Sequence, residues 1–437
     1  MHPEPNRPVQ QEGEHGSLFI LALLAPIAGA AAGLLGAVFR LALEQADRLR
    51  DTLIAQAHDA KLVGFLMVTT ACAAAVAIAA WLVRRFSPPA SGSGIPHVEA
   101  VLNQELPPAP PRLIVVKFFG GLLAIGAGLA LGREGPSVQM GAVIAHLLGK
   151  IFRRGWPDCR VLLAAGAGAG LATAFNAPIA GAVFVLEELV RRFDTRIAIA
   201  ALGASAGAIA VARVLLGPAP DFQVQLLGYA GLRAWPLFVA LGVVSGLVAA
   251  LYNGTLLGAI RAAERLGPWP VELQAGVIGA SVGILAWFAP EMVGGGDPIT
   301  QHVLAGKAVI AMVPLAFLLR FVLGAVSYAA ATPGGLFAPM LVLGAQLGVL
   351  VGAASRLAFP EFDVDPTALA VVGMAAFFTG VVQAPVTGIV LVTEMTGSFT
   401  MLLPMLAACF AAMLVVNLLG SAPIYESLRQ RTVRQPT

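Results

Sequence analysis

The two halves of this chain carry the same spacing of glycine and proline, and this repetition limits the folds open to it. Four stretches recur in the same order, at offsets from 202 residues (92 to 294) to 207 residues (177 to 384). One match is weak in a Gly- and Ala-rich chain, but four collinear matches indicate an internal duplication. The pairs are Gly92-x-Gly94-x-Pro96 with Gly294-x-Gly296-x-Pro298, Lys117-Phe118-x2-Gly121 with Arg320-Phe321-x2-Gly324, Gly132-x3-Pro136-x4-Gly141 with Gly335-x3-Pro339-x4-Gly344, and Ala177-Pro178-x2-Gly181-x5-Glu187 with Ala384-Pro385-x2-Gly388-x5-Glu394.

Long apolar runs place this duplication in a membrane. Of the 437 residues, 58% are hydrophobic and 12% are charged, whereas a soluble domain carries about 25% charged residues. Several runs are shorter or more broken than the ~20 apolar residues that one span needs, and abundant glycine lets helices approach closely. We therefore predict an all-α, polytopic membrane protein of tilted and discontinuous helices, with its site where broken helices from both halves meet.

Composition and charge at the chain ends predict the topology. Residues 1–16 are polar and rich in Pro and Glu, which predicts a disordered N-terminal segment. We assign 17–427 to the transmembrane domain, with repeats at 17–215 and 232–420, and 428–437 to a basic tail. Arginine pairs end several apolar runs and further arginines lie in the tail, so the positive-inside rule predicts that both termini are cytoplasmic.

The motif Gly132-Arg133-Glu134-Gly135-Pro136 sets a carboxylate between two apolar segments. A charged side chain deep in a bilayer costs at least about 2.5–3.5 kcal/mol, so an intramembrane glutamate is a functional candidate. The glycines free the backbone, and the proline suits the first turn of a new helix. We predict a helix start that directs N–H groups and a movable carboxylate at one point. The alternative is a surface turn in which Arg133 pairs with Glu134.

Similar helix starts at Gly92 to Pro96 and Gly335 to Pro339 predict an anion site. The N–H groups at a helix N-terminus lack intrahelical partners and carry about half a positive charge. Several such ends converging inside a membrane would bind an anion weakly enough to release it. Ser93 can add a hydroxyl donor or cap its helix, and Tyr425 is first interpreted as an interfacial anchor.

Other chemistries have little support in the sequence. The three cysteines lie far apart and the six histidines have no ligand-type spacing, so we expect no metal and no other cofactor. The basic residues cluster at segment ends, which is a topology signal, and no nucleic-acid partner is expected. An intramembrane hydrolase based on Ser93 would need a base within hydrogen-bond reach. No motif links His146 or His302 to Ser93, so we do not expect an enzyme.

Three motifs resemble the ion-filter motifs of the CLC family of chloride channels and proton/chloride exchangers. They are Gly92-Ser93-Gly94-Ile95-Pro96, Gly132-Arg133-Glu134-Gly135-Pro136 and Gly335-Leu336-Phe337-Ala338-Pro339. The similarity extends from about Ser17 to Tyr425 and is to the short prokaryotic members, which lack a cytoplasmic CBS pair. It implies inverted-repeat subunits of about eighteen helices. It also implies a homodimer with one ion pathway per subunit, surrounded by lipid in the cell inner membrane.

The resemblance also implies roles for single residues. A central chloride ion, the transported substrate, would be held by two hydroxyls and two backbone N–H groups, from Ser93, Tyr425, Leu336 and Phe337. This role replaces the interfacial anchor first assigned to Tyr425. Glu134 would be the gate that faces the outer aqueous phase. Ser93 favours chloride, because nitrate-preferring relatives carry proline at that position.

Glu188 matches the inner proton-transfer glutamate of the exchangers, whereas many channel-type members carry an apolar residue there. Its alternative role is pairing with Arg191 or Arg192 at a cytoplasmic helix end. We therefore expect a secondary antiporter that exchanges chloride for protons and is gated by Glu134. The alternatives are a passive chloride channel on the same fold and a transporter of an organic anion.

Two features depart from the family pattern. His97 stands where related sequences often carry an acidic residue, which would alter the charge near the inner entrance. Gly294 to Pro298, the repeat of the serine motif, has no serine. The position of Glu134 in the first half is also matched by Phe337 in the second. One half would therefore supply the moving gate and the other a fixed wall of N–H donors.

Overall fold

The structure is a computed structural model that describes residues 8–224, 228, 231–267, 269–359 and 364–434. The described residues form helices and short loops, with no β-strand. The first half contains α1 (Pro8–Ala57), α2 (Lys61–Phe86), α3 (Ile95–Leu102), α4 (Arg112–Gly126), α5 (Glu134–Ile151), α6 (Trp156–Phe175), α7 (Pro178–Phe184) and α8 (Thr195–Leu216). The second half contains α9 (Trp235–Arg265), α10 (Val271–Phe288), α11 (Asp297–Leu304), α12 (Val313–Tyr328), α13 (Phe337–Ala358), α14 (Pro366–Val382), α15 (Pro385–Thr396) and α16 (Leu402–Leu418), followed by α17 (Ile424–Arg434).

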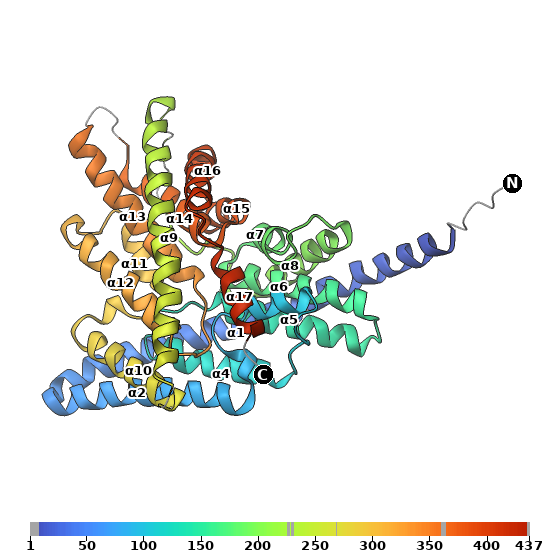
Figure 1. Ribbon diagram of the computed structural model, residues 1–437, viewed down its shortest axis with the longest axis horizontal. Helices are drawn as coiled ribbons and strands as arrows, with labels where there is room; N and C mark the ends of the chain where they lie inside the picture. Colours follow the sequence, from blue (N-terminus) through green and yellow to red (C-terminus); the bar gives the residue numbers. More distant parts are fainter. Residues whose placement is uncertain (1–7, 225–227, 229–230, 268, 360–363, 435–437) are drawn as a thin grey trace.

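The two halves lie beside each other, with α5 to α8 on one side of Figure 1 and α9 and α11 to α16 on the other. Helix α2 packs along α10, and α1 packs along α8. Within the described residues, eight apolar stretches are long enough to cross a membrane. Several helices are shorter and broken, as predicted: α6 ends at Phe175, and α7 restarts at Pro178. These features confirm an all-α, polytopic fold.

A reciprocal pair of helix caps joins the halves. Glu187, just after α7, accepts a hydrogen bond from the N–H of Thr387 in the first turn of α15 at 2.6 Å. Glu394, near the end of α15, accepts one from the N–H of Ala180 in the first turn of α7 at 2.8 Å. Each carboxylate thus binds the positive N-terminal end of the other helix. Such an exchange requires antiparallel helices, as expected for an inverted repeat.

Glycines at matching positions allow close helix packing in each half. A Cβ added to Gly141 of α5 would lie 2.3 Å from the carbonyl oxygen of Gly166 of α6. A Cβ added to Gly344 of α13 would lie 2.5 Å from the carbonyl oxygen of Gly373 of α14. Since these distances exclude any side chain, the backbones themselves are in contact. The duplication therefore extends from the motifs to the packing.

Two predicted boundaries can be compared with the helix ends. Helix α1 begins at Pro8, and residues 1–7 lie outside the described residues, so disorder of the N-terminal segment stays a prediction. This segment contains glutamine and glutamate, which are good helix formers, and it continues directly into the apolar run. The boundary at 427 falls inside α17, where Leu428 is buried and Arg429 forms ion pairs. The basic segment up to Arg434 is therefore part of a packed helix.

Candidate ion-binding site

Backbone hydrogen bonds join the three predicted motifs at the centre of the molecule. Gly132 and Gly335 exchange two of them, with N–O distances of 2.9 and 2.7 Å. Gly92 donates to the carbonyl of Thr332 at 3.0 Å and accepts from the N–H of Gly334 at 3.1 Å. Loops from both halves thus form one junction, as the repeated helix starts predicted.

A helix begins at each motif: α3 at Ile95, α5 at Glu134 and α13 at Phe337. The first N–H groups of each helix have no intrahelical acceptor. The junction of the three loops therefore brings three positive helix ends to one region. Such an arrangement attracts an anion without a full opposite charge.

Two buried cations hold the loops that precede α3 and α11. Lys117 Nζ donates to the carbonyl of Gly92 at 2.8 Å. Arg320, at the matching position of the second half, donates through Nη1 to the carbonyl of Gly294 at 2.7 Å. Each cation binds loop carbonyls from a buried position. These bonds fix the loop conformation that the following helix start needs.

Glu134 is almost fully buried, and its Oε2 has no hydrogen-bond partner among the described residues. A Cβ added to Gly335 would lie 3.0 Å from this oxygen, so the carboxylate rests against the loop of the second half. Its other contacts include the backbone N–H of Ala338, in the first turn of α13. The carboxylate thus occupies the space between the N-termini of α5 and α13. A cavity of about 110 Å³ borders it.

The guanidinium of Arg133 forms ion pairs with two aspartates. Its Nη1 lies 2.9 Å from Asp297 Oδ2, and its Nη2 lies 3.3 Å from Asp221 Oδ2. Asp221 also pairs with Arg40 of α1 at 2.6 Å. The alternative of a surface turn with an Arg133–Glu134 pair is therefore wrong, because Arg133 is held by two other carboxylates and Glu134 is buried.

The hydroxyls of Ser93 and Tyr425 are both buried and lie close to each other. Neither hydroxyl has any further hydrogen-bond partner among the described residues. Ser93 Oγ lies at the N-terminus of α5, since a Cβ added to Gly135 would lie 2.4 Å from it. The N–H of Ser93 itself donates to the hydroxyl of Tyr328 at 3.3 Å. Because Tyr425 is fully buried, the interpretation as an interfacial anchor is wrong.

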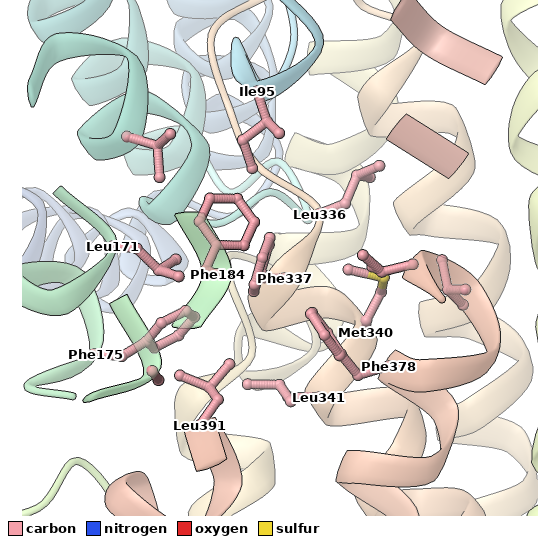
Figure 2. Packing of buried hydrophobic residues seen from close by; sticks show 14 of the residues in the cluster. Ile95, Leu171, Phe175, Phe184, Leu336, Phe337, Met340, Leu341, Phe378 and Leu391 are labelled. Atoms are coloured by element: carbon pink, nitrogen blue, oxygen red, sulfur yellow. The ribbon is translucent and has the colours of Figure 1, made fainter. Parts of the chain in front are cut away.

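Phe337 sits at the centre of an aromatic cluster (Figure 2). Its ring centroid lies 4.8 Å from that of Phe378, 5.7 Å from Phe184 and 5.9 Å from Phe175. The ring of Tyr425 stacks beside it at 6.0 Å. Phe337 is therefore held on several sides, unlike its repeat counterpart Glu134.

Glu188 is buried in a short π-helical turn, Val185–Leu189, that follows α7. Its Oε1 lies 3.4 Å from Arg191 Nη2, so the pairing proposed as its alternative role is present. The same guanidinium nitrogen lies 3.2 Å from Oε1 of Glu99, which is also buried. The inner glutamate thus belongs to a charged cluster.

Sequence reasoning missed several of these residues. Glu99 and Tyr328 carry no motif of their own, and Lys117 was noted only as part of the repeat. A charged residue inside an apolar segment was the available signal for Lys117 and Glu99. His97, noted as a departure, lines a cavity of about 490 Å³ together with Glu264 and Arg431. In the described residues, no group of His, Cys, Asp and Glu could hold a metal ion.

The fold and the site define a class of protein: an inverted-repeat membrane protein with an anion-type site between converging helix ends. The family model described as "Voltage gated chloride channel" matches residues 75–417. The chain therefore belongs to this family, the CLC family, as the three motifs indicated.

Individual relatives are similar to this chain over nearly its whole length. The H(+)/Cl(-) exchange transporter ClcA of Salmonella arizonae is 35% identical over 420 residues, which cover 94% of this chain and 89% of the relative. ClcA of Klebsiella pneumoniae is 36% identical over 418 residues, which cover 94% and 88%. The solved structure of a slow cyanobacterial Cl⁻/H⁺ antiporter has a TM-score of 0.91 and 32% identity, over 95% of this chain and 98% of that chain.

Proposed function

We propose that this protein is a secondary antiporter that exchanges chloride for protons across a membrane, with Glu134 as gate and proton acceptor. One observation carries the proposal. A buried carboxylate with an unpartnered oxygen lies between two helix N-termini, where an anion would be stabilised. A carboxylate tethered where an anion should bind competes with that anion. The relatives' names describe the same exchange.

Competition for one place links the two ions. As a carboxylate, Glu134 has the charge to occupy the site and block the path. A proton neutralises it, so it loses the attraction of the helix ends and moves toward the neighbouring cavity, and chloride enters. Because the linkage is reciprocal, chloride binding favours proton uptake and proton release favours chloride loss.

Chloride itself would bind further inward, between two hydroxyls and two backbone N–H groups. The hydroxyls of Ser93 and Tyr425 are buried close to each other and have no other acceptor among the described residues, which supports this role. The N–H groups of Leu336 and Phe337 lie at the start of α13, where intrahelical acceptors are missing. Neutral donors of this kind bind an anion and still release it.

Protons would reach Glu134 from the cytoplasm through Glu188. The burial of Glu188 supports a group that takes up and returns a proton. The side chains labelled around Phe337 in Figure 2 include no carboxylate, histidine or lysine, so water would carry the proton through this region.

The assembly and location are part of the proposal. We propose a homodimer in the cell inner membrane, multi-pass, with both termini cytoplasmic and with lipid around it. Exposed apolar side chains on α16, such as Phe410 and Leu406, support a surface that faces lipid or a second copy. The bound substrates are chloride and protons, and the proposal needs neither enzymatic chemistry nor a cofactor.

A passive chloride channel is the second candidate. The contact between Glu188 and Arg191 favours it, because an ion-paired carboxylate exchanges protons less readily. Flux and reversal-potential measurements on the purified protein in liposomes distinguish the antiporter from the channel. An imposed chloride gradient should drive protons in the opposite sense, and the reversal potential should move with a proton gradient. A reversal potential set by chloride alone would identify a channel, and flux of neither ion would contradict both.

A further inference from the structure

Arg191 lies between the inner glutamate and the helix that carries Tyr425. Its Nη2 lies 3.4 Å from Glu188 Oε1, and its Nη1 donates to Glu426 Oε2 at 3.0 Å. Glu426 directly follows Tyr425 in the first turn of α17. One guanidinium therefore joins the turn that contains Glu188 to the helix that carries a candidate chloride ligand.

The carboxylates around Arg191 outnumber the guanidinium groups. Glu99 Oε1 lies 3.2 Å from Arg191 and 3.7 Å from Arg429 Nε. Arg429 also pairs with Glu426 at 2.5 Å. Four carboxylates, those of Glu99, Glu105, Glu188 and Glu426, thus share two guanidinium groups. Glu99 and Glu188 are nearly fully buried, so their charges depend strongly on these cations.

Glu105 pairs with Arg429 and so belongs to the same cluster. Charged groups on the neighbouring elements have partners outside the cluster. Glu187 caps α15, as described above. Helices α6 and α8, which also pack against the π-helical turn, carry Asp158 and Arg196, and these pair with each other at 2.6 Å. Arg191 is therefore the cation that contacts Glu188 directly.

The backbone at Arg191 is specialised as well. Its φ is 53°, a left-handed conformation that is uncommon for a residue other than glycine. It follows the π-helical turn Val185–Leu189, and such turns often occur at functional sites. Surrounding contacts must hold a residue in this conformation.

We propose that Glu188 and Glu426 compete for Arg191, which acts as a positioning residue that couples the proton on Glu188 to the placement of α17. The inference rests on the proposed exchange and extends it. When Glu188 is ionised, Arg191 divides its donors among Glu99, Glu188 and Glu426. When Glu188 takes up a proton from the cytoplasmic side, Arg191 binds Glu426 more strongly and holds Tyr425 at the inner end of the chloride path.

The sign of the coupling follows from reciprocity. Without the charge of Glu426, Arg191 is left to stabilise the ionised form of Glu188. Protonation of Glu188 then requires a more acidic solution. The variant Glu426→Gln should therefore shift the midpoint of proton-coupled flux, measured against the pH of one side, by about half a unit toward lower pH.

The test uses proteoliposomes in which a chloride gradient drives proton flux at a series of pH values. Glu264→Gln is the matched control, since it removes the 2.6 Å pair with Arg431 on the same helix without touching the cluster. Glu426→Asp keeps the charge and should restore the original midpoint. Equal midpoints for Glu426→Gln and Glu264→Gln, or a shift toward higher pH, would overturn the inference.

Two further measurements distinguish a failure of the competition for Arg191 from a failure of the proposed chloride/proton exchange. Calorimetry should show that Glu426→Gln still binds chloride, because the groups that bind the ion remain. Loss of chloride binding would show that Glu426 supports the chloride site itself and would overturn the proposed competition for Arg191. In the Glu188→Gln background, Glu426→Gln should leave the pH dependence of chloride flux unchanged. If the unmodified protein moves chloride without protons, the proposed exchange fails; if it exchanges but the variants do not differ, only the competition for Arg191 fails.

Discussion

The two halves of this protein share one scaffold but carry different chemistry. Lys117 and Arg320 occupy matching positions, and each binds carbonyls of the loop before a short helix. The loops they hold differ, since Ser93 in the first half is matched by Gly295 in the second. Ser93 has a buried hydroxyl that lies close to the hydroxyl of Tyr425, whereas the carbonyl of Gly295 is bound by Arg320 at 2.9 Å. Only the first loop can offer a side-chain donor.

The second difference lies at the helix starts of α5 and α13. Glu134 and Phe337 are both buried at the first position of their helix. Glu134 has an unpartnered oxygen beside a cavity, but Phe337 is enclosed by aromatic rings. The duplicated backbone supplies N–H groups from both halves, and the side chain decides which position can move. Function thus arises where the repeat is broken.

The largest effect is expected when the gate loses its charge. Glu134→Gln removes the carboxylate that competes with the anion, so chloride flux should continue while proton coupling is lost completely. Parallel recordings of chloride and proton flux in liposomes test this. Phe337→Leu, at the matching position, is the control and should remain coupled. Persistent coupling in Glu134→Gln would refute the role of the carboxylate.

Removal of the hydroxyl donors should weaken chloride binding without changing the fold. A hydrogen bond to a charged group contributes about 1.5–3 kcal/mol, so Ser93→Ala or Tyr425→Phe should each lower chloride affinity roughly ten- to a hundredfold. Calorimetric titration with chloride measures the change. Ser91→Ala, two residues from Ser93 in the same loop, should bind as the unmodified protein does. An unaltered affinity in both hydroxyl variants would exclude these ligands.

The reciprocal caps should contribute similar stability in the two halves. Glu187→Gln and Glu394→Gln each remove a charge from a helix N-terminus, at a cost of about 1 kcal/mol. The effect for Glu187 should be slightly larger, because its carboxylate also accepts from the Thr387 hydroxyl at 2.6 Å. Thermal unfolding in detergent should show two small, comparable decreases in Tm. A large decrease for only one variant would contradict the symmetry.

The smallest effect is expected when the missing serine is added. A Cβ at Gly295 would meet only an ordinary contact, 3.5 Å from the carbonyl oxygen of Leu131, so Gly295→Ser should fold. Its hydroxyl adds no second chloride site, since Arg320 already holds this loop and Phe337 does not vacate its position. The number of chloride ions bound per subunit should stay the same by calorimetry. An additional site would mean that serine alone distinguishes the halves.

Much of the fold could be predicted from the sequence because the same motif spacing occurs in both halves of the chain. The repeated Gly and Pro spacing identified the helix starts at Ile95, Glu134 and Phe337, and the structure confirms all three. The break between α6 and α7 was visible as a Pro within an apolar run. These features depend on the backbone preferences of glycine and proline, which are local and can be read from the sequence.

The ion pairs could not be predicted, because they depend on tertiary contacts without a local pattern. Arg133 pairs with Asp221 and Asp297, and Arg191 with Glu426, across long distances in the chain. For the same reason, the residue pattern around Tyr425 indicated only an interfacial anchor, and its place in the ion pathway followed from the family resemblance alone. Its position before a basic segment suggested an interface, but α17 packs against α3.

The account depends most on Glu134 and chloride competing for one place, and chloride binding measured against pH tests this directly. We expect the chloride affinity of the purified protein to increase as the pH falls, with proton uptake on binding, because neutral Glu134 leaves the site. Glu134→Gln should bind chloride with an affinity that does not change over the same pH range. A chloride affinity that is independent of pH in the unmodified protein, or proton release on binding, would contradict the competition.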